Sequence, residues 1–286
     1  MRPDPDGTTF DTPVPGGTIG AVRSGAGDVA LLLHGGPALS DVLGELGDEL
    51  RPAGVTTIRY QQRGLAPSTL EGPFGVERHV ADAIAVLDTA GADRAWVVGH
   101  SWGGYLALQV ATRHADRVRG VLAIGTLGGI GDGGGSTLGP NLLARVDAVT
   151  RAELEELDAR ETAGTATDDD LKRSLLLLWP AYFGDAATAP PFPDDLRGSI
   201  EAHTATMASV EPDADRLAAV LATSDVPAVF LHGTRDPIDL DASARATAEA
   251  MPRAEVIALA GVGHFPWLER PGCGADALRR LFVLAG

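Results

Sequence analysis

Six short, mainly apolar runs recur along the chain, with helical patterns between them. They are rich in Val, Leu and Ile and lie at 29–33, 55–60, 95–98, 118–124, 228–231 and 255–259. Because their apolarity is continuous rather than alternating, each run is typical of a strand covered by helices on both faces. Strands and helices in repeated alternation predict an α/β fold with a doubly wound, mostly parallel sheet.

The alternation breaks between 126 and 224, where acidic helical patterns occur at 152–160 and 168–178 and no strand pattern stands out. We interpret the acidic runs as solvated helix faces and first helical turns. Strand-like runs then resume. We therefore predict an α/β core domain made of 1–125 and 225–286, with a helical cap (lid) domain, 126–224, inserted between two strands of its sheet.

The composition is ordinary for a globular protein, and 286 residues suffice for one large α/β domain with an insertion. There are 39 acidic and 23 basic residues, a net charge of −16, so we expect no binding to nucleic acid or to an anionic membrane. The first ten residues lack the pattern of a signal peptide, and no apolar run approaches the ~18 residues of a membrane span. These features predict a cytoplasmic protein.

Cys273 is the only cysteine. An internal disulfide and a thiolate metal cluster within one chain are therefore excluded. We interpret Cys273 as a structural or surface thiol near the last helix.

A nucleophile motif follows the third apolar run. Residues 99–103 read Gly-His-Ser-Trp-Gly, which matches G-x-S-x-G, and a helical pattern comes next. A strand before and a helix after are what this motif requires. The chain must turn sharply there, so a side chain at Gly99 or Gly103 would clash with neighbouring backbone. We predict that Ser101 is the nucleophile.

Two other residues, both far along the chain from Ser101, are predicted to complete a catalytic triad with it. Serine is a weak nucleophile unless a base lies beside it. Asp236 follows the strand predicted at 228–231, and His264 lies in a glycine-flanked loop after the last predicted strand. Catalytic groups gather at such strand ends in open α/β sheets. We predict His264 as general base and Asp236 as the acid that orients it, with Asp239 and Asp241 as rivals for the acid.

The loop His34-Gly35-Gly36-Pro37 follows the first predicted strand and resembles the loop that donates one oxyanion-binding N–H group in α/β-hydrolases. Loss of one such donor typically costs about 2.7–4 kcal/mol in acyl transfer. We predict that the backbone N–H groups of Gly36 and Trp102 form the oxyanion hole. His34 is expected to hold the loop rather than to take part in catalysis.

These residues together resemble the α/β-hydrolase superfamily over nearly all of the chain, and most of all its proline iminopeptidase branch. The motifs concerned are His34-Gly35-Gly36-Pro37, Tyr60-Gln61-Gln62-Arg63-Gly64 with Ser68, and Ser101-Trp102-Gly103. The chain departs from that branch at Gln61, where the branch has Asp, and at Ala66 and His100, where it has Gly. Arg63 is expected to anchor neighbouring loops.

An aminopeptidase must pair the ammonium group of its substrate with carboxylates in the cap, because an unpaired buried charge is costly. In the iminopeptidase branch one such carboxylate follows a cap tryptophan, but here Pro180 follows Trp179. A second lies in an E-N-H-Y-F run, which Glu201-Ala202-His203 matches in part. Glu201 is thus a candidate substrate-binding residue, with a solvated helix position as the alternative.

Aromatic residues of the cap are candidates for the roof of the substrate pocket. Trp179, Tyr182 and Phe183 are expected to cover an apolar acyl or alcohol group, and packing in the core of the cap is the alternative.

The sequence predicts a serine hydrolase that cleaves a small-molecule carboxylic ester, lactone or amide through an acyl-enzyme, without a metal or organic cofactor. The serine disfavours haloalkane dehalogenase and epoxide hydrolase chemistry, which in this fold rely on an aspartate nucleophile. One alternative is an aminopeptidase that releases N-terminal proline. Another is a ligand-binding receptor that retains the triad but turns over slowly. No oligomeric state is predicted.

Replacing the predicted nucleophile tests this interpretation directly. Ser101→Ala should abolish labelling by a fluorophosphonate probe, because only an activated serine attacks the phosphorus. The melting temperature should stay nearly unchanged, since one hydroxyl is removed. Labelling of Ser101→Ala to the wild-type extent would disprove the assignment.

Overall fold

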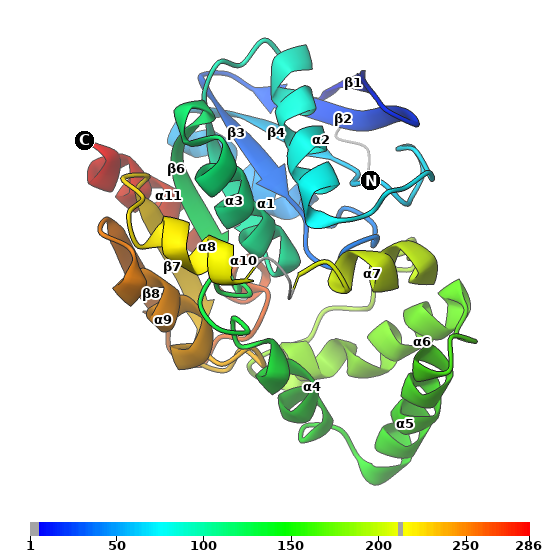
Figure 1. The fold of residues 1–286 in the computed structure, drawn as a ribbon. Helices are drawn as coiled ribbons and strands as arrows, with labels where there is room; N and C mark the ends of the chain where they lie inside the picture. The colour runs from blue at the N-terminus through cyan, green and yellow to red at the C-terminus, as the bar shows by residue number, and fades with distance from the viewer. Residues whose placement is uncertain (1–5, 211–213) are drawn as a thin grey trace.

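The computed structural model describes residues 6–210 and 214–286, which fold around an eight-stranded sheet (Figure 1). Its strand order is β1-β2-β4-β3-β5-β6-β7-β8. The strands are β1 (Thr8–Val14), β2 (Gly17–Gly25), β3 (Asp28–Leu33), β4 (Val55–Tyr60), β5 (Ala95–His100), β6 (Val118–Ile124), β7 (Ala228–Gly233) and β8 (Ala254–Leu259). Strands β1, β2 and β4 pair antiparallel, and all later neighbours pair parallel.

All six strands predicted from apolar runs are confirmed as β3 to β8, and the predicted α/β class is confirmed with them. Every residue of β4, β5 and β7 is buried, as expected of strands covered on both faces, although β4 also buries Thr56, Thr57 and Arg59. The hairpin of β1 and β2 was not predicted. In β1 only Thr12 is fully buried, so an edge strand of this kind carries no apolar run.

Helices cover both faces of the sheet (Figure 1). One core cluster joins the sheet to α2 (Val76–Thr89), α3 (Trp102–Arg113) and α8 (Ala214–Leu221), and α9 (Ala246–Ala250) packs beside α8. The other cluster joins it to α1 (Gly44–Leu50), α10 (Pro266–Glu269) and α11 (Cys273–Ala285). Along β5, Val97 belongs to the first cluster and Val98 to the second, which is the alternation expected of a strand.

The segment between β6 and β7 contains the helices that lie away from the sheet in Figure 1. They are α4 (Gly135–Leu143), α5 (Ala148–Thr162), α6 (Asp168–Leu178), the short turns η3 (Trp179–Tyr182) and η4 (Ala186–Thr188), and α7 (Ile200–Met207). The range predicted for the cap also includes α8. The side chains of Leu217 and Leu221 of α8 pack in the core cluster with α3, so α8 lies in the sheet layers.

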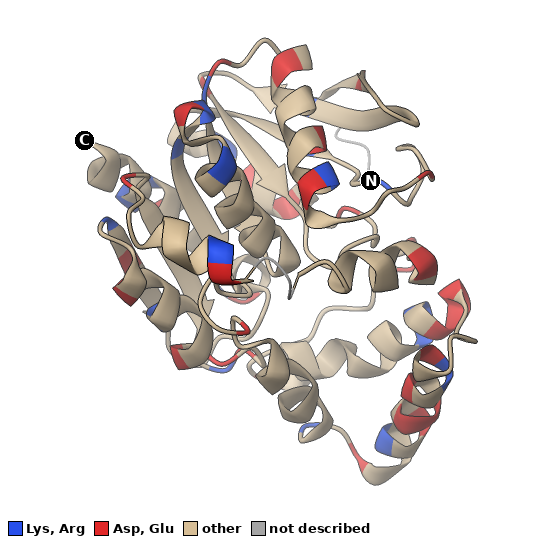
Figure 2. Ribbon diagram, viewed as in Figure 1, with Lys and Arg blue, Asp and Glu red and all other residues tan. Residues whose placement is uncertain are grey.

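Acidic residues gather along α5 and at the start of α6 (Figure 2). Asp168 and Asp169 lie in the first turn of α6, and Asp170 forms a capping box with Thr167. Carboxylates in a first turn stabilise a helix through its macrodipole. None of the helices within 6–210 and 214–286 is both long and apolar enough to cross a bilayer.

Arg63 anchors the loop after β4. Its guanidinium donates to both carboxylate oxygens of Asp82 on α2, at 2.5 and 2.8 Å, and to the carbonyl of Glu71 at 2.7 Å. Both charged side chains are fully buried, at 0% and 2% exposure. This agrees with the anchoring role expected for Arg63.

Breaking this ion pair from one side should destabilise the fold. Arg63→Met leaves the carboxylate of Asp82 buried without its partner, so the free energy of unfolding should fall by about 3–5 kcal/mol in urea titrations. The double variant Arg63→Met/Asp82→Leu should recover much of the loss, because an apolar pair needs no charge compensation. Arg279→Met removes an exposed pair with Asp276 and serves as control. A cost for Arg63→Met no larger than that of the control would refute the anchor.

Candidate active site

Ser101 lies where the chain turns from β5 into α3. Its φ of 55° and ψ of −122° are unusual for a residue with a side chain. A Cβ atom on Gly99 would lie 2.0 Å from the carbonyl oxygen of Gly103, and one on Gly103 would lie 2.0 Å from that of Leu33. The predicted clash at both glycines is therefore confirmed. The turn is held by a 2.9 Å hydrogen bond from the Ser101 N–H to the carbonyl of Ile124 in β6.

Gln62 links the segments that contain the two predicted oxyanion donors, Gly36 and Trp102. Trp102 is the first residue of α3, so its backbone N–H has no acceptor within the helix. The Gln62 side chain donates to the carbonyl of His34 at 2.8 Å and accepts from the Trp102 indole at 3.0 Å. One buried amide thus ties the loop that contains Gly36 to the start of α3.

His34 holds its loop as a neutral imidazole. Its Nδ1 donates to the carbonyl of Gly35 at 2.9 Å, and its Nε2 accepts from the backbone N–H of Gln62 at 3.1 Å. Burial lowers the pKa of His34 below its usual value, and the nearby Asp41 only partly offsets this. The geometry agrees with the loop-holding position expected for His34.

The side-chain amide of Gln61 both donates and accepts a hydrogen bond. The iminopeptidase branch has an aspartate at this position, and a carboxylate could not donate. The Gln61 amide donates to the carbonyl of Leu39 at 2.8 Å and accepts from the N–H of Asp41 at 3.1 Å. An ionised carboxylate accepts hydrogen bonds but donates none. This departure therefore has a structural reason in the loop at 39–41.

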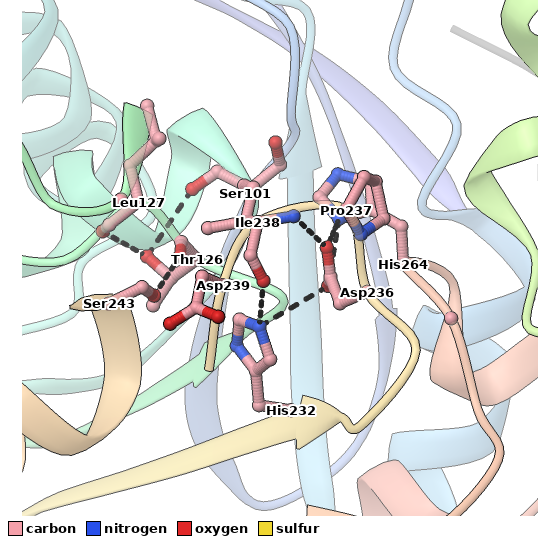
Figure 3. A network of polar contacts seen from close by, with 12 residues as sticks. Ser101, Thr126, Leu127, His232, Asp236, Pro237, Ile238, Asp239, Ser243 and His264 are labelled. Carbon is pink, nitrogen blue, oxygen red and sulfur yellow. Dashed lines mark hydrogen bonds and ion pairs between the residues drawn. The ribbon is translucent and has the colours of Figure 1, made fainter. Parts of the chain in front are cut away.

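His264 and Asp236 form a buried pair. The Nδ1–H of His264 donates to the Asp236 carboxylate, with both oxygens 3.0 Å away, which leaves Nε2 as a lone-pair acceptor (Figure 3). Gly125, directly after Ile124, leaves room for them. A Cβ atom there would stand 2.9 Å from Asp236 Oδ2 and 3.2 Å from His264 Nδ1.

The surroundings keep Asp236 ionised. Burial acts to raise the pKa of its carboxyl group, but His264, His232 and hydrogen bonds outweigh burial and hold the pKa below its usual value. The backbone N–H of Ile238 donates to Oδ1 at 2.8 Å, and His232 Nε2 lies 3.6 Å from Oδ2 while donating to the Ile238 carbonyl (Figure 3).

Asp239 and Asp241, the other candidates for the acid, have other partners. Asp239 accepts from the backbone N–H groups of Asp241 and Ala242 at 3.0 and 2.8 Å, which caps the helical turn that follows. Asp241 pairs with Arg245 on the surface. Asp236 alone of the three candidates is hydrogen-bonded to His264.

The backbone of His264 is held on both sides. Its N–H donates to the carbonyl of Tyr182 in η3 at 2.8 Å. Its carbonyl accepts from His100 Nε2 at 2.9 Å. Burial and then the nearby His264 lower the pKa of His100 well below its usual value, so His100 stays neutral. The segment between β6 and β7 and the turn at Ser101 thus position the same histidine.

Ser101 and His264 line one cavity of about 240 Å³. Its lining also includes Gly36, Trp102 and six leucines, but among the described residues it includes no Asp, Glu, Lys or Arg side chain. Within the described ranges, no group of three His, Cys, Asp or Glu residues is arranged to hold a metal ion. The cavity thus brings a serine and an imidazole together in a mainly apolar surrounding.

The predicted cap residues lie in three different places. Trp179 and Tyr182 line the cavity, and burial followed by the charge of Asp236 raises the pKa of Tyr182 to about 12. Phe183 is buried behind them and stacks on Phe265 at 5.5 Å, outside the lining. Glu201 is exposed on α7 and does not line the cavity. His203, two residues further along α7, does line it, because two helical steps of about 100° each turn it towards the opposite side.

Sequence reasoning missed two polar residues near the site. Gln62 was assigned no role, although its place after a strand's carboxyl end was a usable signal. His203 donates from Nδ1 to the carbonyl of Pro37 at 3.1 Å and lines the cavity. Nothing in the local pattern of α7 distinguishes His203 from Glu201, because only the packing of the helix decides which of them faces inward.

The family model described as alpha/beta hydrolase fold matches residues 29–271, so the chain belongs to the α/β-hydrolase fold family. Epoxide hydrolase B of Mycobacterium tuberculosis is 35% identical over 101 residues, 34% of this chain and 28% of that protein. The 2-hydroxymuconate semialdehyde hydrolase of Pseudomonas putida is 37% identical over 116 residues, 36% of this chain and 38% of that protein. The matches span about a third of the length of these curated relatives.

A solved structure of proline iminopeptidase from Mycobacterium smegmatis has a similar fold. It superposes with a TM-score of 0.68 over 97% of this chain and 99% of that chain, at 21% identity. A likeness at this level of identity concerns the fold alone. The superfamily predicted from the motifs is confirmed.

Neutralising each carboxylate in turn should distinguish Asp236 from Asp239. Asp236→Asn cannot accept from His264 Nδ1–H as a carboxylate does, so we expect ester turnover to fall by about 10,000-fold. Asp239→Asn should stay within a few-fold of wild type, because Asp239 is exposed and caps a helical turn. Steady-state kinetics with p-nitrophenyl butanoate measures both, and a larger loss in Asp239→Asn would overturn the choice of Asp236.

Proposed function

We propose that the protein is a serine hydrolase that cleaves a small, uncharged carboxylic ester, lactone or amide through an acyl-enzyme intermediate. The observation that carries this proposal is the buried Asp236–His264 pair beside the cavity that Ser101 lines. His264 Nε2 is left as an acceptor for the serine proton, which is what nucleophilic activation of a hydroxyl requires.

The proposed reaction has two steps. In the first, the Ser101 hydroxyl attacks the substrate carbonyl as His264 takes its proton, and the N–H groups of Gly36 and Trp102 bind the oxyanion. The bond to the leaving group breaks, and His264 returns the proton to that group. In the second, a water gives its proton to His264 and attacks the ester on Ser101. The acid product leaves, and the serine regains its proton. Asp236 stabilises the imidazolium in both steps.

The positive end of α3 adds to the oxyanion site. Ser101 is the N-cap residue of α3, a helix of 12 residues, so the developing negative charge would lie at the helix N-terminus. Helix N-termini favour anions through their unpaired N–H groups and their dipole. Gln62 supports this arrangement, because it fixes the start of α3 against the loop that contains Gly36.

The lining of the cavity favours an uncharged substrate over an N-terminal peptide amine. Among the described residues no carboxylate lines the cavity, and Glu201 is exposed elsewhere. A substrate ammonium would therefore enter without a counter-ion, at a large cost in desolvation. Among the residues that the structure describes, the proline iminopeptidase alternative therefore finds no carboxylate in the cavity for its substrate.

The sequence relatives agree with hydrolysis of a small molecule. One is named a 2-hydroxymuconate semialdehyde hydrolase and another an epoxide hydrolase. Epoxide opening in this fold relies on an aspartate nucleophile, and the residue at that position of the turn is Ser101 here. Carbonyl chemistry therefore fits this chain better than epoxide opening.

We also propose that the segment 126–224 acts as a cap through α4 to α7. Leu138, Leu171, Trp179 and Met207, from α4, α6, η3 and α7, line the cavity beside Ser101. They exclude water from the place where the acyl-enzyme would form, and exclusion of water strengthens the electrostatic interactions there.

Paired substrates test the proposal. The protein should turn over p-nitrophenyl butanoate for many cycles, but cleave the anionic p-nitrophenyl hemisuccinate at least ~100-fold less efficiently, because a charge entering the cavity finds no partner. L-proline p-nitroanilide should be a poor substrate, and Glu201→Gln should change neither ester rate. A single burst without sustained product would favour the receptor alternative. Efficient release of proline, impaired by Glu201→Gln, would favour the aminopeptidase.

A further inference from the structure

The cavity beside the candidate nucleophile has two walls of different chemistry. The first is aromatic and begins at His264, whose ring lies 5.2 Å from that of Tyr182 and 5.3 Å from that of Phe265. The Trp179 ring lies 4.9 Å from Phe265, and Phe192 lies 5.7 Å from Trp179. All four of these aromatic residues line the cavity, and we call them the aromatic wall.

The second wall is aliphatic and begins at the predicted oxyanion loop. Leu39 fills the space beside Gly36, since a Cβ atom on that glycine would lie 2.1 Å from Leu39 Cδ1. Leu39 and Leu171 meet at Gly198, where a Cβ atom would lie 2.9 and 2.7 Å from their side chains. Leu196 also lines the cavity. We call Leu39, Leu171 and Leu196 the aliphatic wall.

Helix α6 and the turn η3 that continues it join the two walls. Leu171, Leu175 and Trp179 are spaced four residues apart, so they share one face, and all three line the cavity. The lining therefore changes from aliphatic to aromatic along this face. The aliphatic end lies near Gly36 and the aromatic end near His264.

The chemistry of acyl transfer assigns one part of the substrate to each wall. When the first tetrahedral intermediate collapses, the bond between the carbonyl carbon and the leaving oxygen or nitrogen breaks, and that atom takes its proton from His264 Nε2. The leaving group must therefore lie beside His264, where the aromatic wall begins. The acyl group stays bonded to Ser101 and extends away from the base, along the aliphatic wall.

This inference rests on the proposed function. The geometry points to a substrate whose leaving alcohol or amine carries one aromatic ring and whose acyl group is short and aliphatic. Aromatic rings gain from edge-to-face or offset contacts with other rings, whereas an alkyl chain needs only apolar surface. The volume of about 240 Å³ is below the ~300–1,000 Å³ typical of ligand pockets, so the substrate has one ring and a short chain.

Two isomeric esters test the assignment. Benzyl butanoate carries its phenyl ring on the leaving alcohol, and propyl phenylacetate carries it on the acyl group. The kcat/KM of each is divided by its rate constant for hydroxide-catalysed hydrolysis, which removes the intrinsic difference in reactivity. We expect the normalised value for benzyl butanoate to be higher by about threefold to tenfold.

Variants of the aromatic wall should change the preference between the two isomers, and a variant of the aliphatic wall should change the preference for acyl-chain length. Phe192→Leu and Trp179→Leu should bring the ratio between the isomers towards one. Leu171→Ala should instead lower the preference for benzyl butanoate over benzyl acetate. Leu176→Ala, on the exposed side of α6 and outside the cavity, is the matched control and should change neither ratio. Thermal melting checks that each variant folds.

Failure of the wall assignment can be distinguished from failure of the proposed function. A protein that a fluorophosphonate labels at Ser101, but that prefers propyl phenylacetate or shows equal normalised rates, overturns the assignment of the walls alone. So does a preference for benzyl butanoate that both aromatic-wall variants retain in full. Absence of both labelling and ester turnover overturns the proposed function, and the assignment with it.

Discussion

Between Gly99 and Gly103 the backbone passes so close to its neighbours that no side chain fits at either position. The carbonyl of Leu33 at the end of β3 and the first turn of α3 occupy the space where Cβ atoms would stand. This close approach forces Ser101 into a positive φ and brings the loop after β3 beside the N-terminus of α3. Gln62 then links the loop after β3 to the Trp102 side chain at the start of α3.

Charge is distributed around this turn in a way that suits proton transfer. Asp236 is the ionised group next to His264, while His34 and His100 have pKa values lowered by burial and stay neutral. A neutral His100 can hold the His264 carbonyl without opposing a positive charge on the His264 ring.

The segment between β6 and β7 takes part in the site as well as covering it. The carbonyl of Tyr182 holds the backbone N–H of His264, so the position of the histidine depends on the packing of η3. Two of the three departures from the iminopeptidase motifs also have structural roles here. Gln61 ties the loop at 39–41 with both ends of its amide, and His100 binds the His264 carbonyl through a side chain that glycine lacks.

The sequence by itself determined the α/β class, six of the strands and the candidates Ser101, Asp236 and His264, because continuous apolar runs and glycine-flanked turns are local signals. It favoured Asp236 over Asp239 and Asp241 by position after the strand, but all three follow one strand, and only folding brings Asp236 to His264. It also missed the hairpin of β1 and β2, whose pattern at the sheet edge is too polar to register as a strand.

Tertiary structure alone decided the lining of the cavity. Four residues of the segment between β6 and β7 had been expected to contact substrate, and the fold turned Trp179 and Tyr182 inward, buried Phe183 behind them and left Glu201 in solvent. Helical periodicity gives the angle between neighbours but not which face meets the sheet. That choice depends on contacts such as those of Leu39 and Leu171 at Gly198, which join segments far apart in the chain.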